Sequence, residues 1–237
     1  MLIDTHTHAP IPDGVDKIIF SSADPADTKP VFDAAQKNSN IFCTLGIHPD
    51  YLDAELNYEH LLDNPKVVGV GEIGLEYHYE KDGGRRRRQI ELFERQLEIA
   101  RRANLPVAVH SRDAEDDTMA VLKNVAGVMH CFTSNYDFAK VMLDRGFFIS
   151  ASGIITFKNS AALRETFSKI PIDRIVAETD APWVAPVPYR GRDATPAMVI
   201  ETVKYLADIK KVPLVEMEDI LWNNAHKLYP KLCQDKL

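Results

Sequence analysis

Residues 2–8, LIDTHTH, follow Met1 and have the composition of a β-strand that ends in two histidines. β-Branched residues favour an extended backbone, in which positions i and i+2 point to the same face of a sheet. Asp4, His6 and His8 are therefore expected to share one side of this strand. Two imidazoles that converge in this way suit a metal ion, because each offers a nitrogen lone pair in a fixed direction. Such pairs also occur on exposed strands, so the rest of the chain must decide.

Seven further β-branched runs alternate with helical patterns along the chain. The predicted strands are residues 2–7, 15–21, 41–46, 67–72, 106–110, 127–131, 147–150 and 174–178. Helical patterns lie at 25–37, 85–102, 114–122, 136–144, 161–167, 196–209 and 215–224, and Ser134 is the predicted cap of the helix at 136–144. Strands that alternate with helices indicate parallel pairing with right-handed crossovers. Eight of them favour a closed (β/α)8 TIM barrel of the α/β class.

The length of 237 residues is close to the roughly 250 residues typical of such a barrel. Residues 1–237 are therefore expected to form a single domain. One connection departs from the pattern, because residues 9–14 read APIPDG and cannot hold a helix. The first outer helix of the barrel is expected to be missing, and a second copy of the chain or another partner is a candidate to cover that face.

Composition narrows the class of function. A net charge of −7 argues against a protein that coats nucleic acid through a broad basic surface, but it allows an enzyme that grips one phosphate through metal ions. Three widely spaced cysteines, Cys43, Cys131 and Cys233, indicate neither a disulfide framework nor a thiolate zinc site. The chain shows no targeting segment and no apolar run long enough to span a membrane. A cytoplasmic protein without membrane contact is expected.

Polar residues follow the ends of the predicted strands, where active sites of TIM barrels are built. They are His6 and His8 after the first strand, His48 after the third, Glu72 ending the fourth, His110 ending the fifth, His130 in the sixth and Asp180 after the eighth. A single zinc ion usually takes three or four protein ligands. The six candidate ligands His6, His8, Glu72, His110, His130 and Asp180 therefore suggest two ions about 3.5–4 Å apart, with Glu72 bridging them.

Two metal ions in this arrangement suit the hydrolysis of a phosphate ester by a metal-activated water, with Glu72 and Asp180 as catalytic residues. Asp180 is expected to orient or deprotonate the water. Taken alone, His130 fits equally well as a buried core histidine and Glu72 as the partner of a buried arginine. The coincidence of these residues at strand ends favours the metal site.

Other residues near these ends have two interpretations each. Arg112 is expected to grip a phosphate oxygen, because a guanidinium presents a bidentate fork, or to form a structural ion pair. His48 is expected to contact substrate or support a ligand, and Asp4 and Glu178 to orient ligands. Trp183 and Tyr189 flank the Asp180 loop, where they either stack on a nucleobase or pack within the loop.

The chain resembles the TatD-type metal-dependent DNases of the amidohydrolase superfamily. The resemblance rests on DTHTH (4–8), GIHP (46–49), GEIGLEY (71–77), LPVAVHSRDA (105–114), HCF (130–132), SASGIITFK (150–158) and ETDAPWVAPVPYRG (178–191). It implies that His6, His8 and Asp180 hold one divalent ion, that His110 and His130 hold a second, and that Glu72 bridges them. It also implies hydrolysis of DNA phosphodiesters, commonly from the 3′ end at DNA ends or single strands. The family's usual metal is magnesium or manganese.

The identity of the ions and of the substrate stays open at this stage. Imidazole-rich sites suit zinc, whereas magnesium prefers oxygen ligands, so Mg²⁺, Mn²⁺ and Zn²⁺ are all candidates. Glu76 stands where the family usually has Asp, Thr133-Ser134 where Ser-Gly is usual, and residues 192–196 replace a loop that commonly resembles RNEP. Alternatives are an amide or aminoacyl-ester hydrolase of the same superfamily and a non-catalytic barrel that serves as a binding component. Many amide hydrolases use a carboxylated lysine on the fourth strand, where this chain has Glu72.

Overall fold

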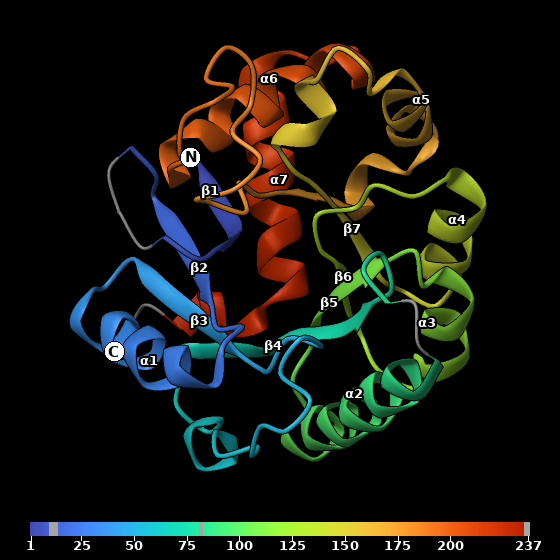
Figure 1. Cartoon of the computed structure of the whole chain (residues 1–237). Helices are drawn as coiled ribbons and strands as arrows, with labels where there is room; N and C mark the ends of the chain where they lie inside the picture. The colour runs from blue at the N-terminus through green and yellow to red at the C-terminus, as the bar shows by residue number, and fades with distance from the viewer. Residues whose placement is uncertain (10–13, 81–82, 235–237) are drawn as a thin grey trace.

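The computed structural model describes residues 1–9, 14–80 and 83–234. Its strands form one parallel sheet in which the order along the chain is also the order in space (Figure 1). The strands are β1 (Ile3–Thr7), β2 (Lys17–Ser21), β3 (Ile41–Leu45), β4 (Val67–Glu76), β5 (Val107–Arg112), β6 (Gly127–Met129), β7 (Phe148–Ala151) and β8 (Ile175–Ala177). The predicted eight-stranded α/β barrel is confirmed.

Helices surround the sheet, and an α-helix follows β2 and each strand from β4 onward, whereas β3 is followed by a 3-10 turn (Figure 1). The α-helices are α1 (Thr28–Lys37), α2 (Gly83–Ala103), α3 (Glu115–Val121), α4 (Tyr136–Asp144), α5 (Ala161–Lys169), α6 (Val199–Lys210) and α7 (Leu214–Leu228). Short 3-10 turns are η1 (Pro25–Asp27), η2 (Glu59–Leu61), η3 (Gly153–Thr156), η4 (Ile172–Arg174), η5 (Pro196–Met198) and η6 (Pro230–Gln234). In the described part of the chain, every helix is too short or too polar to cross a bilayer.

The N-cap of α4 differs from the prediction. Asn135, and not Ser134, caps this helix, because the Asn135 side chain accepts a hydrogen bond from the amide of Phe138. The Ser134 hydroxyl instead donates to Glu115 Oε1 at 2.7 Å and so links α4 to the start of α3. Serine and asparagine both cap helices well, so their intrinsic preference does not distinguish Ser134 from Asn135. The contact of Ser134 with Glu115 leaves Asn135 as the cap.

The barrel closes between its first and last strands through side-chain and backbone hydrogen bonds. Thr5 Oγ1 donates to the carbonyl of Ala177 at 2.9 Å, and the amide of Asp180 donates to the carbonyl of His6 at 3.0 Å. The second of these bonds brings the loop that carries Asp180 to the end of β1. The closure therefore also assembles residues from the two ends of the chain.

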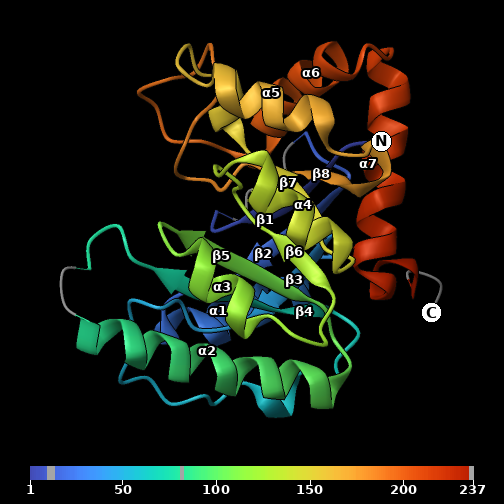
Figure 2. The same ribbon diagram turned by 90° about the vertical axis from the view of Figure 1, so that its right-hand side faces the viewer.

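The interior of the barrel is apolar at the amino-terminal ends of the strands. One side chain from each strand lies there, namely Ile3, Ile19, Phe42, Val68, Ala108, Val128, Phe148 and Val176. Residues from the end of α7, the residue after it and η6 pack against this layer, namely Ala225, Leu228, Tyr229 and Leu232. Figure 2 shows α7 running across this end of the barrel, opposite the side toward which the strands point.

Positions two residues further along these strands lie nearer the carboxyl end, because side chains alternate across a strand. Ser21, Thr44, His110, His130, Ser150 and Glu178 occupy such positions, each two residues beyond an interior apolar side chain. The polar layer therefore begins where the apolar layer stops, and the functional side chains of different strands meet above it.

The first outer helix is missing as predicted, since the described residues between β1 and β2, 8–9 and 14–16, form no helix. The strands are nevertheless covered, because β1 is buried throughout and β2 is buried from Ile18 onward. Ala9 packs against Ala181, Ala185 and Ala194, and Gly14, with a φ of +78°, approaches Ala197 so closely that an added Cβ would lie 3.1 Å from its methyl carbon. The chain's own segment 181–197 thus helps cover this face, and covering it does not require a partner.

Candidate metal centre

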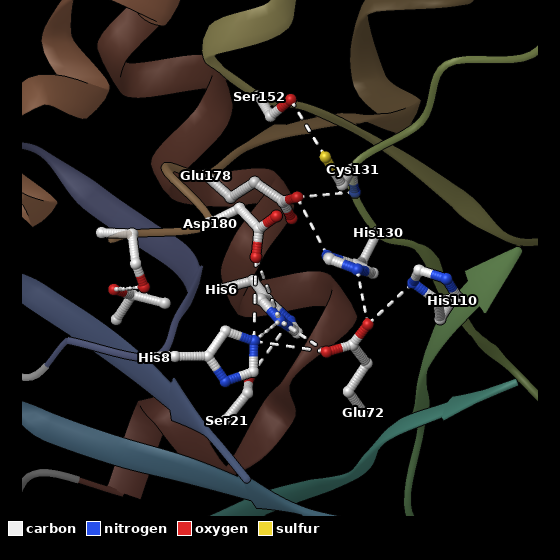
Figure 3. Close-up of polar contacts among 12 residues, drawn as sticks. His6, His8, Ser21, Glu72, His110, His130, Cys131, Ser152, Glu178 and Asp180 are labelled. Atoms are coloured by element: carbon white, nitrogen blue, oxygen red, sulfur yellow. Dashed lines mark hydrogen bonds and ion pairs between the residues drawn. The ribbon is translucent and has the colours of Figure 1, made fainter. Parts of the chain in front are cut away.

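Glu72 lies in the middle of β4 with its carboxylate buried between two groups of histidines (Figure 3). Its Oε1 atom is 2.9 Å from both His110 Nδ1 and His130 Nε2. Its Oε2 atom is 3.2 Å from His8 Nε2 and 3.6 Å from His6 Nε2. Each carboxylate oxygen therefore faces a different pair of imidazoles, which is the arrangement expected of a bridging ligand.

The first group joins the end of β1 to the loop after β8. The Nε2 atoms of His6 and His8 are 3.1 Å apart, and Asp180 Oδ1 lies 4.0 Å and 3.7 Å from them. Two imidazole nitrogens bound about 2.0–2.1 Å from one zinc ion would be about 3.3 Å apart in a tetrahedral site. The donor set and its spacing therefore fit a divalent cation, which would relieve the repulsion between two converging nitrogen lone pairs.

The second group lies on the other side of Glu72 and comes from β5, from the residue after β6 and from the loop after β3. His110 and His130 supply one nitrogen each, and His48 Nε2 is 3.8 Å from the same Oε1 atom of Glu72. His48 thus lies closer to the candidate ligands than its place after β3 implied. The side chains of this group also have the types that bind a transition-metal ion.

The imidazoles are held by hydrogen bonds on their far nitrogens. Ser21 Oγ is 3.1 Å from His6 Nδ1, Glu178 Oε1 is 3.1 Å from His130 Nδ1, and Glu76 Oε2 is 3.1 Å from His110 Nε2. A carboxylate here accepts an N–H bond, so the nitrogen that faces Glu72 is the one that a bound cation would use after displacing its proton. Partners of this kind orient metal-binding histidines and raise their basicity.

Glu178 and Asp4 lie behind these ligands, where both side chains are fully buried. Glu178 accepts hydrogen bonds from the amide of Cys131 at 2.6 Å and from Ser150 Oγ at 2.6 Å, in addition to its contact with His130. Asp4 accepts from the amide and hydroxyl of Thr179 at 2.9 Å and 2.5 Å. The carboxylate of Asp4 also accepts from the amide of His6 at 3.3 Å, so it links the end of β1 to the residue before Asp180.

The protonation of the cluster reflects these contacts. Burial opposes a charge on Glu72, but His130, His110 and His48 outweigh it and hold the pKa of Glu72 well below its usual range. Burial likewise opposes a charge on His110, and Glu72 and Glu76 nevertheless raise its pKa to about 9. Burial lowers the pKa of His6 to about 4, and burial raises that of Asp180 to about 6. The acid–imidazole pairs therefore hold protons that a bound cation would displace.

The cluster forms the floor of a cavity of about 690 Å³ at the carboxyl end of the barrel. The described residues that line it include four carboxylates, Asp50, Glu72, Glu76 and Asp180, and one arginine, Arg112. The Arg112 side chain is 44% exposed and its Nη1 atom is 3.8 Å from Glu76 Oε2. It is therefore available to a ligand in the cavity and is not fixed in a buried ion pair.

Sequence reasoning noted Glu76 only as a departure from the family pattern, and it missed Ser21 as a support of His6 and Tyr79 in the cavity wall. Glu76 is four residues beyond Glu72, so an extended β4 places both carboxylates on one face. If the predicted strand is extended past Gly74, the sequence places the Glu76 carboxylate beside that of Glu72. Tyr189 packs against the buried alanines Ala181, Ala185 and Ala194, as the alternative interpretation of this residue expected.

Comparisons with known proteins identify relatives of this chain. A family model described as TatD related DNase matches residues 3–230. The uncharacterized metal-dependent hydrolase YcfH of Escherichia coli is 39% identical over 206 residues, which are 83% of this chain and 77% of that protein. The uncharacterized metal-dependent hydrolase YabD of Bacillus subtilis is 31% identical over 97% of this chain and 99% of its own length.

Solved structures show the same likeness in three dimensions. The crystal structure of YjjV, a TatD homologue from Escherichia coli, superimposes with a TM-score of 0.88 at 28% identity, over 97% of this chain and 98% of that one. A hydrolase of the TatD family from Entamoeba histolytica gives a TM-score of 0.79 at 20% identity, which supports the fold. The chain therefore belongs to the TatD-related DNase family, whose members are metal-dependent hydrolases of the amidohydrolase superfamily.

Proposed function

We propose that the protein hydrolyses phosphodiester bonds of DNA and removes nucleotides from the 3′ end of single strands, with two divalent ions. The observation that carries the proposal is the division of the imidazoles by Glu72, because His6 and His8 face one carboxylate oxygen and His110 and His130 face the other. Asp180 completes the first set. A buried carboxylate between two sets of nitrogen donors is the requirement for a pair of ions that share a ligand.

The bound ions would supply positive charge that stabilises the phosphate oxygens and the leaving oxygen and lowers the pKa of the attacking water. The protein's side chains position the reactants. Asp180, whose Oδ1 atom lies 3.7 Å and 4.0 Å from the Nε2 atoms of His8 and His6, can accept the proton of the attacking water through its carboxylate. Arg112 reaches into the cavity and can donate two hydrogen bonds to a non-bridging phosphate oxygen pair.

The charge of the cavity also supports dependence on cations. The wall has four carboxylates, Asp50, Glu72, Glu76 and Asp180, and in the metal-free protein their charge is offset by Arg112 and by protons on histidines such as His110. Once the histidines lose these protons, a phosphate group would be repelled by such a wall unless cations were bound there. The protein therefore needs the ions for substrate binding as well as for the reaction.

The test is cleavage of single-stranded DNA labelled at its 5′ end, after chelation and re-addition of Mg²⁺, Mn²⁺ or Zn²⁺. Shortening from the 3′ end that returns with metal, and is absent in Glu72→Ala, is the expected result. Glu91→Gln is the control, because Glu91 is exposed on α2 and pairs with Arg87. No cleavage with any metal, despite metal bound to the purified protein, would refute the proposal and favour a small ester or amide substrate.

A further inference from the structure

Two aromatic side chains stand exposed in the wall of the cavity. Trp183 is 56% exposed and Tyr79 is 72% exposed, and both line the space above the candidate metal ligands. Single exposed aromatic rings are common on protein surfaces, but these two line the same cavity as the candidate metal ligands. Their place beside the candidate site indicates contact with the substrate.

The two rings lie on opposite sides of Glu72. The ring of Trp183 is 5.0 Å from that of His8, which faces Glu72 Oε2. Tyr79 is on the other side, because the guanidinium of Arg112 lies 5.2 Å from its ring centre and 3.8 Å from Glu76. Glu76 in turn contacts His110, which faces Glu72 Oε1.

We propose that Trp183 and Tyr79 each stack on one of the two bases that flank the phosphate being cleaved. This inference rests on the proposed function and names the part of the DNA that the site grips. The phosphate then lies between the rings above Glu72, with Arg112 beside Tyr79 to bind its oxygens. Neither ring lies among the candidate metal ligands, so they act by positioning the strand.

This placement predicts the conformation of the substrate. Neighbouring bases in a duplex stack directly on each other, about 3.4 Å apart along one strand. Rings on opposite sides of the ligand cluster must hold the two bases apart, so the step at the scissile phosphate has to be unstacked. Stacking on aromatic rings tolerates every base, since each base has a π-face. The site is therefore expected to ignore base identity and to require two planar bases.

The experiment uses 5,6-dihydrothymidine, whose saturated ring is not planar, in single-stranded oligonucleotides otherwise made of thymidine. The analogue replaces thymidine at the last or at the penultimate nucleotide, and the rate of removal of the last nucleotide is measured. In the wild-type protein, either replacement should lower kcat/KM by about 5- to 150-fold, the factor that corresponds to the loss of one base–aromatic stack.

The variants assign each ring to one base. Trp183→Ala should no longer distinguish the analogue from thymidine at one position, and Tyr79→Ala should no longer do so at the other. Trp183→Phe and Tyr79→Phe keep a ring and should keep the discrimination. Both side chains are exposed, so the urea unfolding midpoint of each variant should match that of the wild type.

Three results would overturn the inference. If the wild-type protein treats both analogues as it treats thymidine, the bases are not gripped, although DNA cleavage stands. If both alanine variants lose discrimination at the same position, the two rings do not hold separate bases. If no oligonucleotide is shortened with any metal, the proposed function itself fails, which the all-thymidine substrate reveals independently.

Discussion

Glu76→Gln should weaken one metal-binding step and leave the other unchanged. The Glu76 carboxylate accepts two N–H donors, the ring Nε2 of His110 at 3.1 Å on one oxygen and the amide of His78 at 2.8 Å on the other. Glutamine has one carbonyl oxygen and one NH2 group in the same shape. One of the two donors would therefore face an NH2 group, and His110 would lose its anionic partner.

The size of the effect follows from the place of Glu76 behind a single ligand. Loss of a partner behind a metal-binding histidine typically costs about 10- to 100-fold in affinity, or about 1.4–2.7 kcal/mol. The contact is buried, so water does not readily replace it. The set formed by His6, His8 and Asp180 has no contact with Glu76 among the described residues, and its binding step should keep its dissociation constant.

Calorimetric titration of the metal-free protein with Mn²⁺ or Zn²⁺ resolves the two steps. Glu91→Gln, which removes an exposed carboxylate of α2, is the matched control and should bind both ions as the wild type does. An unchanged pair of affinities in Glu76→Gln would refute the argument that this carboxylate supports His110. Equal weakening of both steps would show that the two sets are not independent.

Three further outcomes are expected. Asp180→Asn should lower kcat by about 100- to 10,000-fold in the DNA cleavage assay, the range for loss of a general base, with an unchanged urea unfolding midpoint; activity within a few-fold of wild type would remove Asp180 from the mechanism. The pKa of His110 is raised to about 9 without a cation, so this residue is protonated near neutral pH. Metal affinity should therefore rise with pH toward that value, and metal binding should release protons, which calorimetry in buffers of different ionisation enthalpy measures. A metal affinity that does not depend on pH would contradict this. Tyr229→Ala should lower the free energy of unfolding by about 3–5 kcal/mol in urea titrations, because a fully buried ring at the apolar end of the barrel is lost. Its metal affinity should stay unchanged, and a lowered affinity would show that the two ends of the barrel are coupled.

Much of the fold was predictable because strand patterns are local. The runs at residues 41–46 and 67–72 gave the start of β3 and of β4 correctly. The end of β4 was missed by four residues, since Gly71 and Gly74 weaken a strand pattern. Pairing with β5, in which Glu76 lies opposite Arg112, extends the strand, and this pairing is a property of the assembled sheet.

The candidate ligands were predictable for a different reason. Parallel strands bring their carboxyl ends to one face, so a histidine such as His110 can be placed without knowing its neighbours. The atoms in contact could not be placed in this way. That His110 turns its Nδ1 atom to Glu72 and its Nε2 atom to Glu76 depends on the angle between β4 and β5. The position of Asp4 against Thr179 likewise depends on how the barrel closes.

The packing of α7 against the amino-terminal ends of the strands has a consequence for synthesis on the ribosome. Side chains from all eight strands, from Ile3 to Val176, pack with residues that are translated only after them, Leu228 and Tyr229 among them. Until these residues leave the ribosome, the nascent barrel exposes an apolar end that can bind chaperones or aggregate with other chains. A polypeptide released before these residues would carry every candidate ligand and still lack part of the apolar core at this end of the barrel.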